Sequence, residues 1–369
     1  MILVLVFVAA AAAYQLLALG AALRHLAKKE RAPAGLPPVS ILKPVRGLDP
    51  HFREAIRSHA TQDYPEYEIL FGVADPSDPA AEEIRHLIEE FPQQQIRLMC
   101  GSSEAANAKV GMLIGLAKDA RYPLLVVNDS DILVPPDYLR RIVGPLEDPA
   151  VGLVTCLYSA VADQWPGRWE ALGIATDFMP SVLVAPLTGV REFGLGATLL
   201  FRAEDLRAIG GFQALADFLA DDYQLARRLT KLGRRVVLSK LAVETCLTGR
   251  TWGEVWSHQV RWARTIRVSR GGGYLGLPLA NGSLWALVAL MAGAWWAALP
   301  LLALRVAAAL TVGVGILNSP DVRRHFYLIP LRDLWGFAVW CRGLAGNTVE
   351  WRASRLRLTR DGRIAEKLR

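Results

Sequence analysis

The amino-terminal residues carry no charge from Met1 to Leu23. A helix over this run is long enough to cross a hydrocarbon core of about 30 Å. Basic residues follow the run directly, whereas a cleaved signal peptide has them before a shorter apolar core. We therefore predict an uncleaved membrane anchor over residues 1–24, with a buried core helix as the alternative, and a linker over 25–38. The basic cluster after the anchor places the next domain in the cytoplasm.

A second apolar block covers residues 275–320 and contains a single charged residue, Arg305. Pro300 separates it into two stretches of near-spanning length, so we predict a transmembrane hairpin over residues 271–320. Residues 327–345 mix charged side chains with tryptophans. That composition favours an interfacial helix within 321–350 over a segment that crosses the membrane. The anchor and the hairpin together return the carboxyl end to the cytoplasm.

Residues 351–369 hold seven Lys or Arg against Asp361 and Glu366, a net charge of +5 within a chain of net charge +7. We interpret this segment as a basic cytoplasmic tail whose partners are anionic lipid headgroups. A plain solvated tail is the alternative. No nucleic-acid partner is expected, because the basic residues flank apolar spans and no aromatic-basic platform or helix-turn-helix pattern occurs between them.

Apolar strands and helices alternate between residues 39 and 127. Strands are predicted near 39–42, 68–73, 96–99 and 124–127, and helices over 52–60, 79–91 and 108–117. This alternation predicts an α/β fold with a mainly parallel sheet and helices on both faces. Ligands of such sheets bind at the carboxyl ends of the strands. A dinucleotide site or a kinase-like ATP site is not supported, because no glycine-rich phosphate loop is present.

Two acidic residues follow the apolar strand Leu124–Val127 in the sequence Asn-Asp-Ser-Asp. Asp129 and Asp131 therefore emerge at a strand's carboxyl end, where carboxylate oxygens suit a hard divalent cation. Magnesium or manganese at this point would offset the charge that develops on the diphosphate of a departing nucleotide. An acidic turn that caps a helix is the alternative.

Two further candidates lie upstream of this pair. Asp75 leaves the strand 68–73 and could accept a hydrogen bond from a uracil or ribose group of a bound nucleotide. The alternative is that Asp75 or Asp78 shapes the turn and caps the next helix. Lys109 could contact a phosphate, or it could be an ordinary solvated surface lysine.

Downstream, Asp221 and Asp222 open a helix that ends near Gly233. A general base for a hydroxyl acceptor is a carboxylate or an imidazole, so Asp222 could be that base, and a helix cap is the equal alternative. The helix over 251–267 carries Arg261 and Trp262. Arg261 could hold a leaving diphosphate and Trp262 could stack on the acceptor, unless this basic face only contacts lipid headgroups.

Asp75, Asp129, Asp222 and Arg261-Trp262 follow one another in the order and spacing of the signature of ceramide glucosyltransferases, which the whole chain resembles. The resemblance extends to residues 41–50, 63–65, 151–154 and 351–358. Residues 219–223 and 261–267 closely resemble the bacterial hopanoid glycosyltransferases of the same group. His258 departs from the Gln or Arg of the signature, and Asp131 adds a second acid that makes a metal-binding pair more plausible.

The resemblance implies a GT-A fold, an inverting mechanism, a UDP-sugar donor and a divalent metal. It also implies that Asp222 is the base, Asp129 binds the metal and Asp75 contacts the nucleotide. We expect a catalytic domain over residues 39–270 that uses UDP-glucose or UDP-N-acetylglucosamine to glycosylate a membrane lipid, either ceramide or a hopanoid. The expected location is a bacterial inner membrane. A processive polysaccharide synthase would need more spanning helices, and a non-enzymatic lipid-binding protein would not need three acidic strand ends.

Overall fold

The computed structural model describes residues 1–30, 33–101, 103–351 and 354–368. Residues 31–32 of the predicted linker and residues 352–353 and 369 of the predicted tail lie outside this part. The chain forms two compact units. The sheet unit comprises Lys29–Tyr158 and Arg191–Cys246, and the helical unit comprises Met1–Lys28, Ser159–Val190 and Leu247–Arg369. The predicted catalytic domain, residues 39–270, is thus shared between the two units.

The described residues of the sheet unit build an eight-stranded sheet in the order β3-β2-β1-β4-β7-β6-β8-β5. Its strands are β1 (Val39–Val45), β2 (Tyr67–Val73), β3 (Gln95–Cys100), β4 (Leu124–Val127), β5 (Ile132–Leu133), β6 (Val151–Val161), β7 (Leu199–Arg202) and β8 (Arg235–Cys246). Strands β1 to β4 are parallel, as predicted from the alternating pattern. Strand β7 runs antiparallel to β4 and β6, and β5 runs antiparallel to β8.

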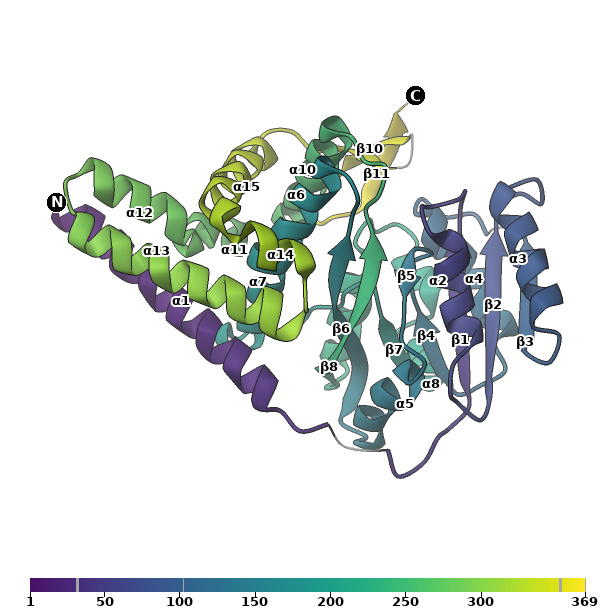
Figure 1. Ribbon diagram of the computed structural model, residues 1–369. Helices are drawn as coiled ribbons and strands as arrows, with labels where there is room; N and C mark the ends of the chain where they lie inside the picture. The colour runs from purple at the N-terminus through teal and green to yellow at the C-terminus, as the bar shows by residue number, and fades with distance from the viewer. Residues whose placement is uncertain (31–32, 102, 352–353, 369) are drawn as a thin grey trace. The chain divides into compact units, whose positions relative to one another are not determined.

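Helices cover both faces of this sheet because consecutive strand residues point to opposite sides (Figure 1). Ile41 packs with the helices α2 (Phe52–Ala60), α3 (Pro79–Glu90) and α5 (Tyr138–Val143). Its neighbour Leu42 packs with α4 (Ala108–Asp119), α8 (Ala203–Ala208) and α9 (Asp221–Lys231) on the other face. Both cores are apolar, so the predicted layered α/β arrangement is confirmed.

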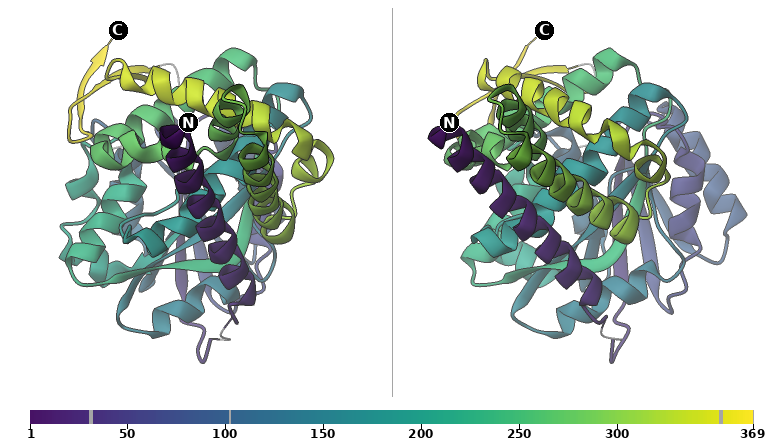
Figure 2. Two further views of the ribbon diagram at one scale, coloured as in Figure 1. Left: turned by 90° about the vertical axis from the view of Figure 1, so that its left-hand side faces the viewer. Right: turned by 60° about the vertical axis from the view of Figure 1, so that its left-hand side comes forward.

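The helical unit contains the two apolar regions at the ends of the chain. Helix α1 (Ile2–Ala27) lies beside α12 (Gly282–Met291) and α13 (Trp295–Leu310), as Figure 2 shows. Their contact is built from small side chains, including the buried Ala11, Ala289 and Ala298. In lipid, where no hydrophobic effect drives helices together, small residues let the helices approach closely enough for van der Waals packing to hold them. The remaining helices of this unit are α6 (Trp165–Gly173), α7 (Met179–Val184), α10 (Trp252–Ser269), α11 (Gly271–Gly276), α14 (Pro320–His325) and α15 (Ile329–Leu344).

The hairpin between α12 and α13 turns at Gly293, and the prediction that Pro300 divides it is wrong. Gly293 adopts a φ of 77°, and the N–H groups of Gly293 and Ala294 donate to the carbonyls of Leu290 and Ala289. This is the hydrogen-bond pattern of a Schellman helix end, which favours glycine. Pro300 lies inside α13, a position that apolar helices tolerate when neighbouring groups compensate.

Three helices in the described ranges are long and apolar enough to cross a membrane: Ile2–Ala27, Trp165–Thr188 and Trp295–Ile316. A bent pair, Gly272–Ala280 with Gly282–Met291, adds a fourth if it forms one span. The sequence analysis missed Trp165–Thr188. This segment cannot cross once, because Val154 before it pairs with Leu200 after it in one sheet.

The basic carboxyl-terminal region is folded where the structure describes it. The strands β9 (Thr348–Trp351), β10 (Ser354–Leu358) and β11 (Ile364–Leu368) form an antiparallel sheet. Leu356 and Leu358 are buried, whereas Arg355 and Arg357 are exposed. Because successive side chains of a strand point to opposite faces, β10 has an apolar face and a basic face.

Candidate active site

The turn after β4 is anchored by a buried amide and presents two carboxylates. Asn128 is completely buried, and its Nδ2 donates to the Ala197 carbonyl (2.7 Å) and to the Tyr138 hydroxyl (3.0 Å). These contacts fix the backbone where the strand ends. Asp129 and Asp131 follow at the carboxyl edge of the parallel strands, as the sequence predicts.

Lys109 joins two of the predicted acidic positions. Its Nζ lies 2.8 Å from Asp129 Oδ1 and 3.3 Å from Asp221 Oδ2. Burial alone would lower the pKa of Lys109, but the charges of Asp129 and Asp221 raise it above its ordinary value. Lys109 is therefore a fixed cation between carboxylates, unlike the solvated surface lysine of the alternative interpretation.

Asp222 lies beside this cluster in the first turn of α9. The residue that caps α9 is Ala220, and the Asp222 carboxylate accepts a hydrogen bond from the N–H of Tyr223 (2.7 Å). Burial, together with the neighbouring charge of Asp221, raises the pKa of Asp222. Asp222 is not the capping residue, and its environment makes its carboxylate more basic than usual.

Two glycines let the backbone pass close to these carboxylates. A Cβ at Gly196 would lie 2.8 Å from Asp129 Oδ2, and one at Gly194 would lie 2.9 Å from the carbonyl oxygen of Asp222. Any larger residue would displace the groups that it meets. The segment containing both glycines therefore connects the Asp129 region with the Asp222 region.

The carboxylate of Asp131 accepts a hydrogen bond from the hydroxyl of Thr245. Burial, followed by the charge of Asp129, raises the pKa of Asp131. A surplus of negative charge at this turn is the electrostatic condition that a divalent cation relieves. In the described ranges, no group of three or more His, Cys, Asp or Glu side chains could hold a metal. The pair still fits magnesium, which usually binds one or two carboxylates and completes its shell with substrate phosphates and water.

The sequence analysis did not select Lys43, a buried lysine in β1. Its Nζ donates to the backbone carbonyl of Asp129 (3.1 Å) and lies 3.4 Å from Nε2 of His59. Nδ1 of His59 lies 2.9 Å from the Ala55 carbonyl. Burial lowers the pKa of Lys43 to about 7, although Asp131 and Asp129 act in the other direction. The sequence feature that points to Lys43 is the presence of a lysine inside the apolar strand Val39–Val45.

Asp75 is exposed, and its contacts are local. Its carboxylate accepts hydrogen bonds from the N–H and the hydroxyl of Ser77, each at 2.8 Å. Asp78 caps α3 and also accepts from the N–H of Gly47. Both residues therefore make the turn and cap contacts of the alternative interpretation, and a role of Asp75 toward a nucleotide stays a prediction.

Arg261 and Trp262 belong to α10 in the helical unit. The Trp262 ring lies 4.6 Å from the His258 ring and 5.2 Å from that of Phe178. His258 Nδ1 lies 2.5 Å from Glu170 Oε1, and Arg250 pairs with the same carboxylate at 2.9 Å. At the position where the signature has Gln or Arg, this chain therefore has a side chain held by Glu170.

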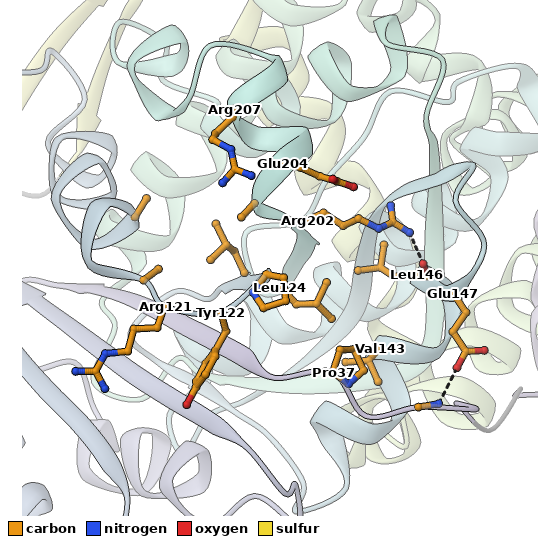
Figure 3. Close-up of a pocket in the computed structure, with 16 residues that line it drawn as sticks. Pro37, Arg121, Tyr122, Leu124, Val143, Leu146, Glu147, Arg202, Glu204 and Arg207 are labelled. Carbon is orange, nitrogen blue, oxygen red and sulfur yellow. Dashed lines mark hydrogen bonds between the residues drawn. The ribbon is translucent and has the colours of Figure 1, made fainter.

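A cavity of about 570 Å³ lies in the sheet unit, away from the candidate active site (Figure 3). Tyr122 and Leu124 line it at the beginning of β4, so it opens at the amino ends of the parallel strands. Arg202 also lines it and donates to the Leu146 carbonyl. None of the predicted site residues lines this cavity.

Comparisons with known proteins show which family the chain is similar to. A family model described as glycosyl transferase family 21 matches residues 3–364. Ceramide glucosyltransferase 1 of Caenorhabditis elegans is 27% identical over 207 residues, which cover 55% of this chain and 44% of that protein. Ceramide glucosyltransferase 3 of the same organism is 28% identical over 222 residues, 59% and 47% of the two chains. The matches span less than half of these relatives.

Similarity to solved structures extends over nearly the whole chain, as one example shows. It is a mannosyltransferase from Pyrobaculum calidifontis in complex with GDP-Man and Mn2+, with a TM-score of 0.58 and 21% identity. The likeness covers 92% of this chain and 96% of that one. It confirms the predicted GT-A-type fold.

Proposed function

The chain belongs to glycosyl transferase family 21, and we propose that it moves a hexose from a UDP-sugar to the hydroxyl of a membrane lipid with inversion. The observation that carries this proposal is the cluster of Asp129, Lys109 and Asp222 at the carboxyl edge of the sheet. Family membership makes the chain a glycosyltransferase. The similarity to ceramide glucosyltransferases supports a lipid acceptor of the ceramide type.

The donor is expected to bind at the turn after β4. Asp129 and Asp131 would hold a magnesium or manganese ion, which supplies positive charge for the departing diphosphate. Lys109 contributes a second, permanent cation next to Asp129. Asp75, at the end of β2, would accept a hydrogen bond from the nucleoside, and Arg261 would add a third cation for the diphosphate.

Asp222 is the proposed general base. It removes the proton of the lipid hydroxyl while the hydroxyl oxygen bonds to the anomeric carbon and the bond to UDP breaks. A single displacement inverts the anomeric centre. The raised pKa of Asp222 suits this role, because a stronger base accepts the proton more readily at neutral pH. Trp262 would stack on the acceptor.

In our proposed topology α1 anchors the chain, and the bent pair of Gly272–Ala280 and α12 crosses the membrane. Trp295–Ile316 crosses back, and the sheet unit lies on the cytoplasmic side of a bacterial inner membrane. Arg24, His25, Lys28 and Lys29 follow the apolar part of α1, in agreement with the positive-inside tendency. The exposed arginines of β10 would contact anionic headgroups.

The acceptor and the donor sugar are tested together. Purified full-length protein in detergent, with manganese or magnesium, is assayed for UDP release with UDP-glucose or UDP-N-acetylglucosamine and with ceramide or bacteriohopanetetrol. We expect metal-dependent release with ceramide as the acceptor. Release with bacteriohopanetetrol alone would identify the hopanoid alternative, and no release from any pair would contradict the proposed function.

A further inference from the structure

The backbone of Asp129 is held by hydrogen bonds on both sides of its Cα. Its N–H donates to the Gly196 carbonyl (3.3 Å), and its C=O accepts from Lys43 Nζ (3.1 Å) and from the N–H of Ile132 (3.4 Å). The contact from Lys43 is made by a side chain. A substitution can therefore remove it and leave the backbone hydrogen bonds in place.

Lys43 reaches this carbonyl from the neighbouring strand of the sheet. Strand β1 pairs in parallel with β4, and Leu42 lies opposite Val127 at the end of the pairing. The next residues along the two strands are Lys43 and Asn128, so the lysine lies beside the start of the acidic turn. Its side chain is fully buried. The amine is thus part of the core and is not an ordinary surface cation.

A buried histidine orients the Lys43 amine. His59 Nδ1 lies 2.9 Å from the Ala55 carbonyl, which can only accept a hydrogen bond, so Nδ1 carries the proton. Burial lowers the pKa of His59 well below its ordinary value, so the ring is neutral and its Nε2 is an acceptor. Nε2 lies 3.4 Å from Lys43 Nζ. The amine therefore donates to two fixed acceptors, the ring of His59 and the carbonyl of Asp129.

An amine at this position of β1 costs stability. Burial disfavours its charged form, which is why the pKa of Lys43 is lowered. An apolar side chain would occupy the same core without this cost. Residues that break the local pattern of a core are expected at functional sites. The amine carries N–H donors with or without its extra proton, so its contact with Asp129 is kept in both forms.

We propose that Lys43 is a positioning residue for the candidate metal site. Its hydrogen bond to the Asp129 carbonyl fixes the turn so that the carboxylates of Asp129 and Asp131 are oriented toward a divalent cation and the diphosphate of the donor. Lys43 acts through the backbone of Asp129 and is not itself a ligand. The inference rests on the proposed function, since it assigns a residue that prepares the donor site.

Two effects of Lys43 on a bound cation would oppose each other. Its positive charge repels a cation held by Asp129 and Asp131, so removal of a lysine that contributed only charge would strengthen metal binding. Removal of a lysine that positions the turn would weaken metal binding, because the carboxylates lose their fixed orientation. The sign of the change therefore distinguishes the two roles.

The test uses Lys43→Met, which keeps an unbranched side chain and removes the N–H donors. UDP is titrated calorimetrically into the full-length protein in detergent at increasing manganese concentrations. We expect the manganese concentration for half-maximal UDP binding to rise about tenfold, the effect of one lost hydrogen bond. A concentration that stays constant or falls would overturn the proposal.

Ser40→Ala is the matched control in the same strand. Ser40 is fully buried, donates to Glu68 Oε1 (2.7 Å) and accepts from the N–H of Tyr122 (3.1 Å). We expect a lower unfolding temperature and an unchanged manganese requirement. A rise equal to that of Lys43→Met would indicate a general weakening of β1 and would overturn the proposal.

His59→Phe tests the same role with Lys43 in place. A phenyl ring keeps the packing against Tyr138, whose ring centroid lies 6.2 Å from that of His59, but it removes the Nε2 acceptor. We expect the manganese requirement to rise by a smaller factor than in Lys43→Met. If Lys43→Met does not fold, this variant decides the question, and an unchanged requirement overturns the proposal.

Failure of this inference can be told apart from failure of the proposed function. A wild-type protein that binds UDP with manganese but transfers no sugar would refute the proposed function and leave the role of Lys43 standing. A wild-type protein that transfers sugar, with an unchanged manganese requirement in Lys43→Met, would refute only the role of Lys43.

Discussion

Asp222 is the residue on which the proposed chemistry depends most. We expect Asp222→Asn to lower kcat by about 10²–10⁴-fold, because the amide cannot accept the proton, while metal-dependent UDP binding persists. Asp221→Asn is the matched comparison: Asp221 pairs with Lys109, so its loss should cost less. Steady-state kinetics and calorimetric titration with UDP measure both effects. A larger loss in the Asp221 variant would assign the base to Asp221.

The environment of Asp222 also predicts a pH dependence. The base must be unprotonated to act, and burial and the charge of Asp221 raise its pKa. The rate should therefore decline with falling pH at values well above those at which an ordinary aspartate is protonated. A kcat profile between pH 5 and pH 9 tests this. A rate that stays constant down to the usual range of aspartate would show that Asp222 does not titrate as proposed.

The candidate site residues that could be selected from the sequence are those that follow a recognisable local pattern. Asp129 and Asp131 come directly after a buried strand, and strand ends define the binding edge of a parallel sheet. Lys43 is a charged residue inside an apolar strand, but that pattern does not reveal its role, which depends on the tertiary contact with the carbonyl of Asp129. The contact between His258 and Glu170 joins residues far apart in the chain, so the sequence contains no local sign of it either.

At the scale of elements, the backbone at Gly196 passes so close to the Asp129 carboxylate that this position has room only for glycine. Gly196→Ala would place a Cβ 2.8 Å from Asp129 Oδ2, so the carboxylate must move. We expect metal-dependent UDP binding to weaken at least severalfold while the fold persists, because the displaced atom is the end of a side chain.

Gly115→Ala is the control for this change. Gly115 lies inside α4 with nothing within 4 Å of the added carbon. This substitution should raise the free energy of unfolding by about 0.5–1 kcal/mol and leave UDP binding unchanged. Calorimetry with UDP and thermal unfolding separate the two effects. Equal UDP affinities in the two variants would refute the importance of Gly196.

A buried ion pair joins α13 to α15. Arg305 donates to both oxygens of Asp333 at 2.8 and 2.6 Å, and the hydroxyl of Ser283 in α12 donates to the same carboxylate. Asp333→Leu should destabilise the helical unit by about 3–5 kcal/mol, because Arg305 loses its partner. Adding Arg305→Met should recover much of this loss. Thermal unfolding in detergent measures both. A double variant no more stable than the single one would contradict this account.

Elements differ in how well their boundaries could be predicted. The parallel strands and their helices followed from apolar runs and helix starts. The turn of the hairpin was misplaced because proline was taken as the break, whereas the Schellman contacts at Gly293 end the helix. The antiparallel pairing of β7 with β4 joins residues far apart in sequence, so no local pattern could reveal it.

At the scale of the whole molecule, the pairing of β6 with β7 restricts the topology. The sheet unit must lie on one side of the membrane. The candidate crossings that remain among the described helices are α1, Trp295–Ile316 and, if it forms one span, the bent pair Gly272–Ala280 with Gly282–Met291. We expect Cys100, which is exposed in the sheet unit, to be cytoplasmic. Met291, 82% exposed at the turn of the hairpin, should face the opposite side.

Labelling of spheroplasts with an impermeant maleimide tests this topology in a Cys341→Ser background, which removes the other exposed thiol. Cys100 should react only after permeabilisation, whereas Met291→Cys should react in intact spheroplasts. Reaction of Cys100 in intact spheroplasts would place the sheet unit outside the cytoplasm.

The central claim is that the acidic edge of the sheet transfers a sugar from UDP to a lipid. It is tested most directly by incubating membranes that contain the full-length protein with radiolabelled UDP-glucose, ceramide and manganese, and by counting the label in the lipid extract. We predict incorporation in the wild type, and its loss on chelation of the metal and in Asp222→Asn. Incorporation that survives both changes would contradict the account.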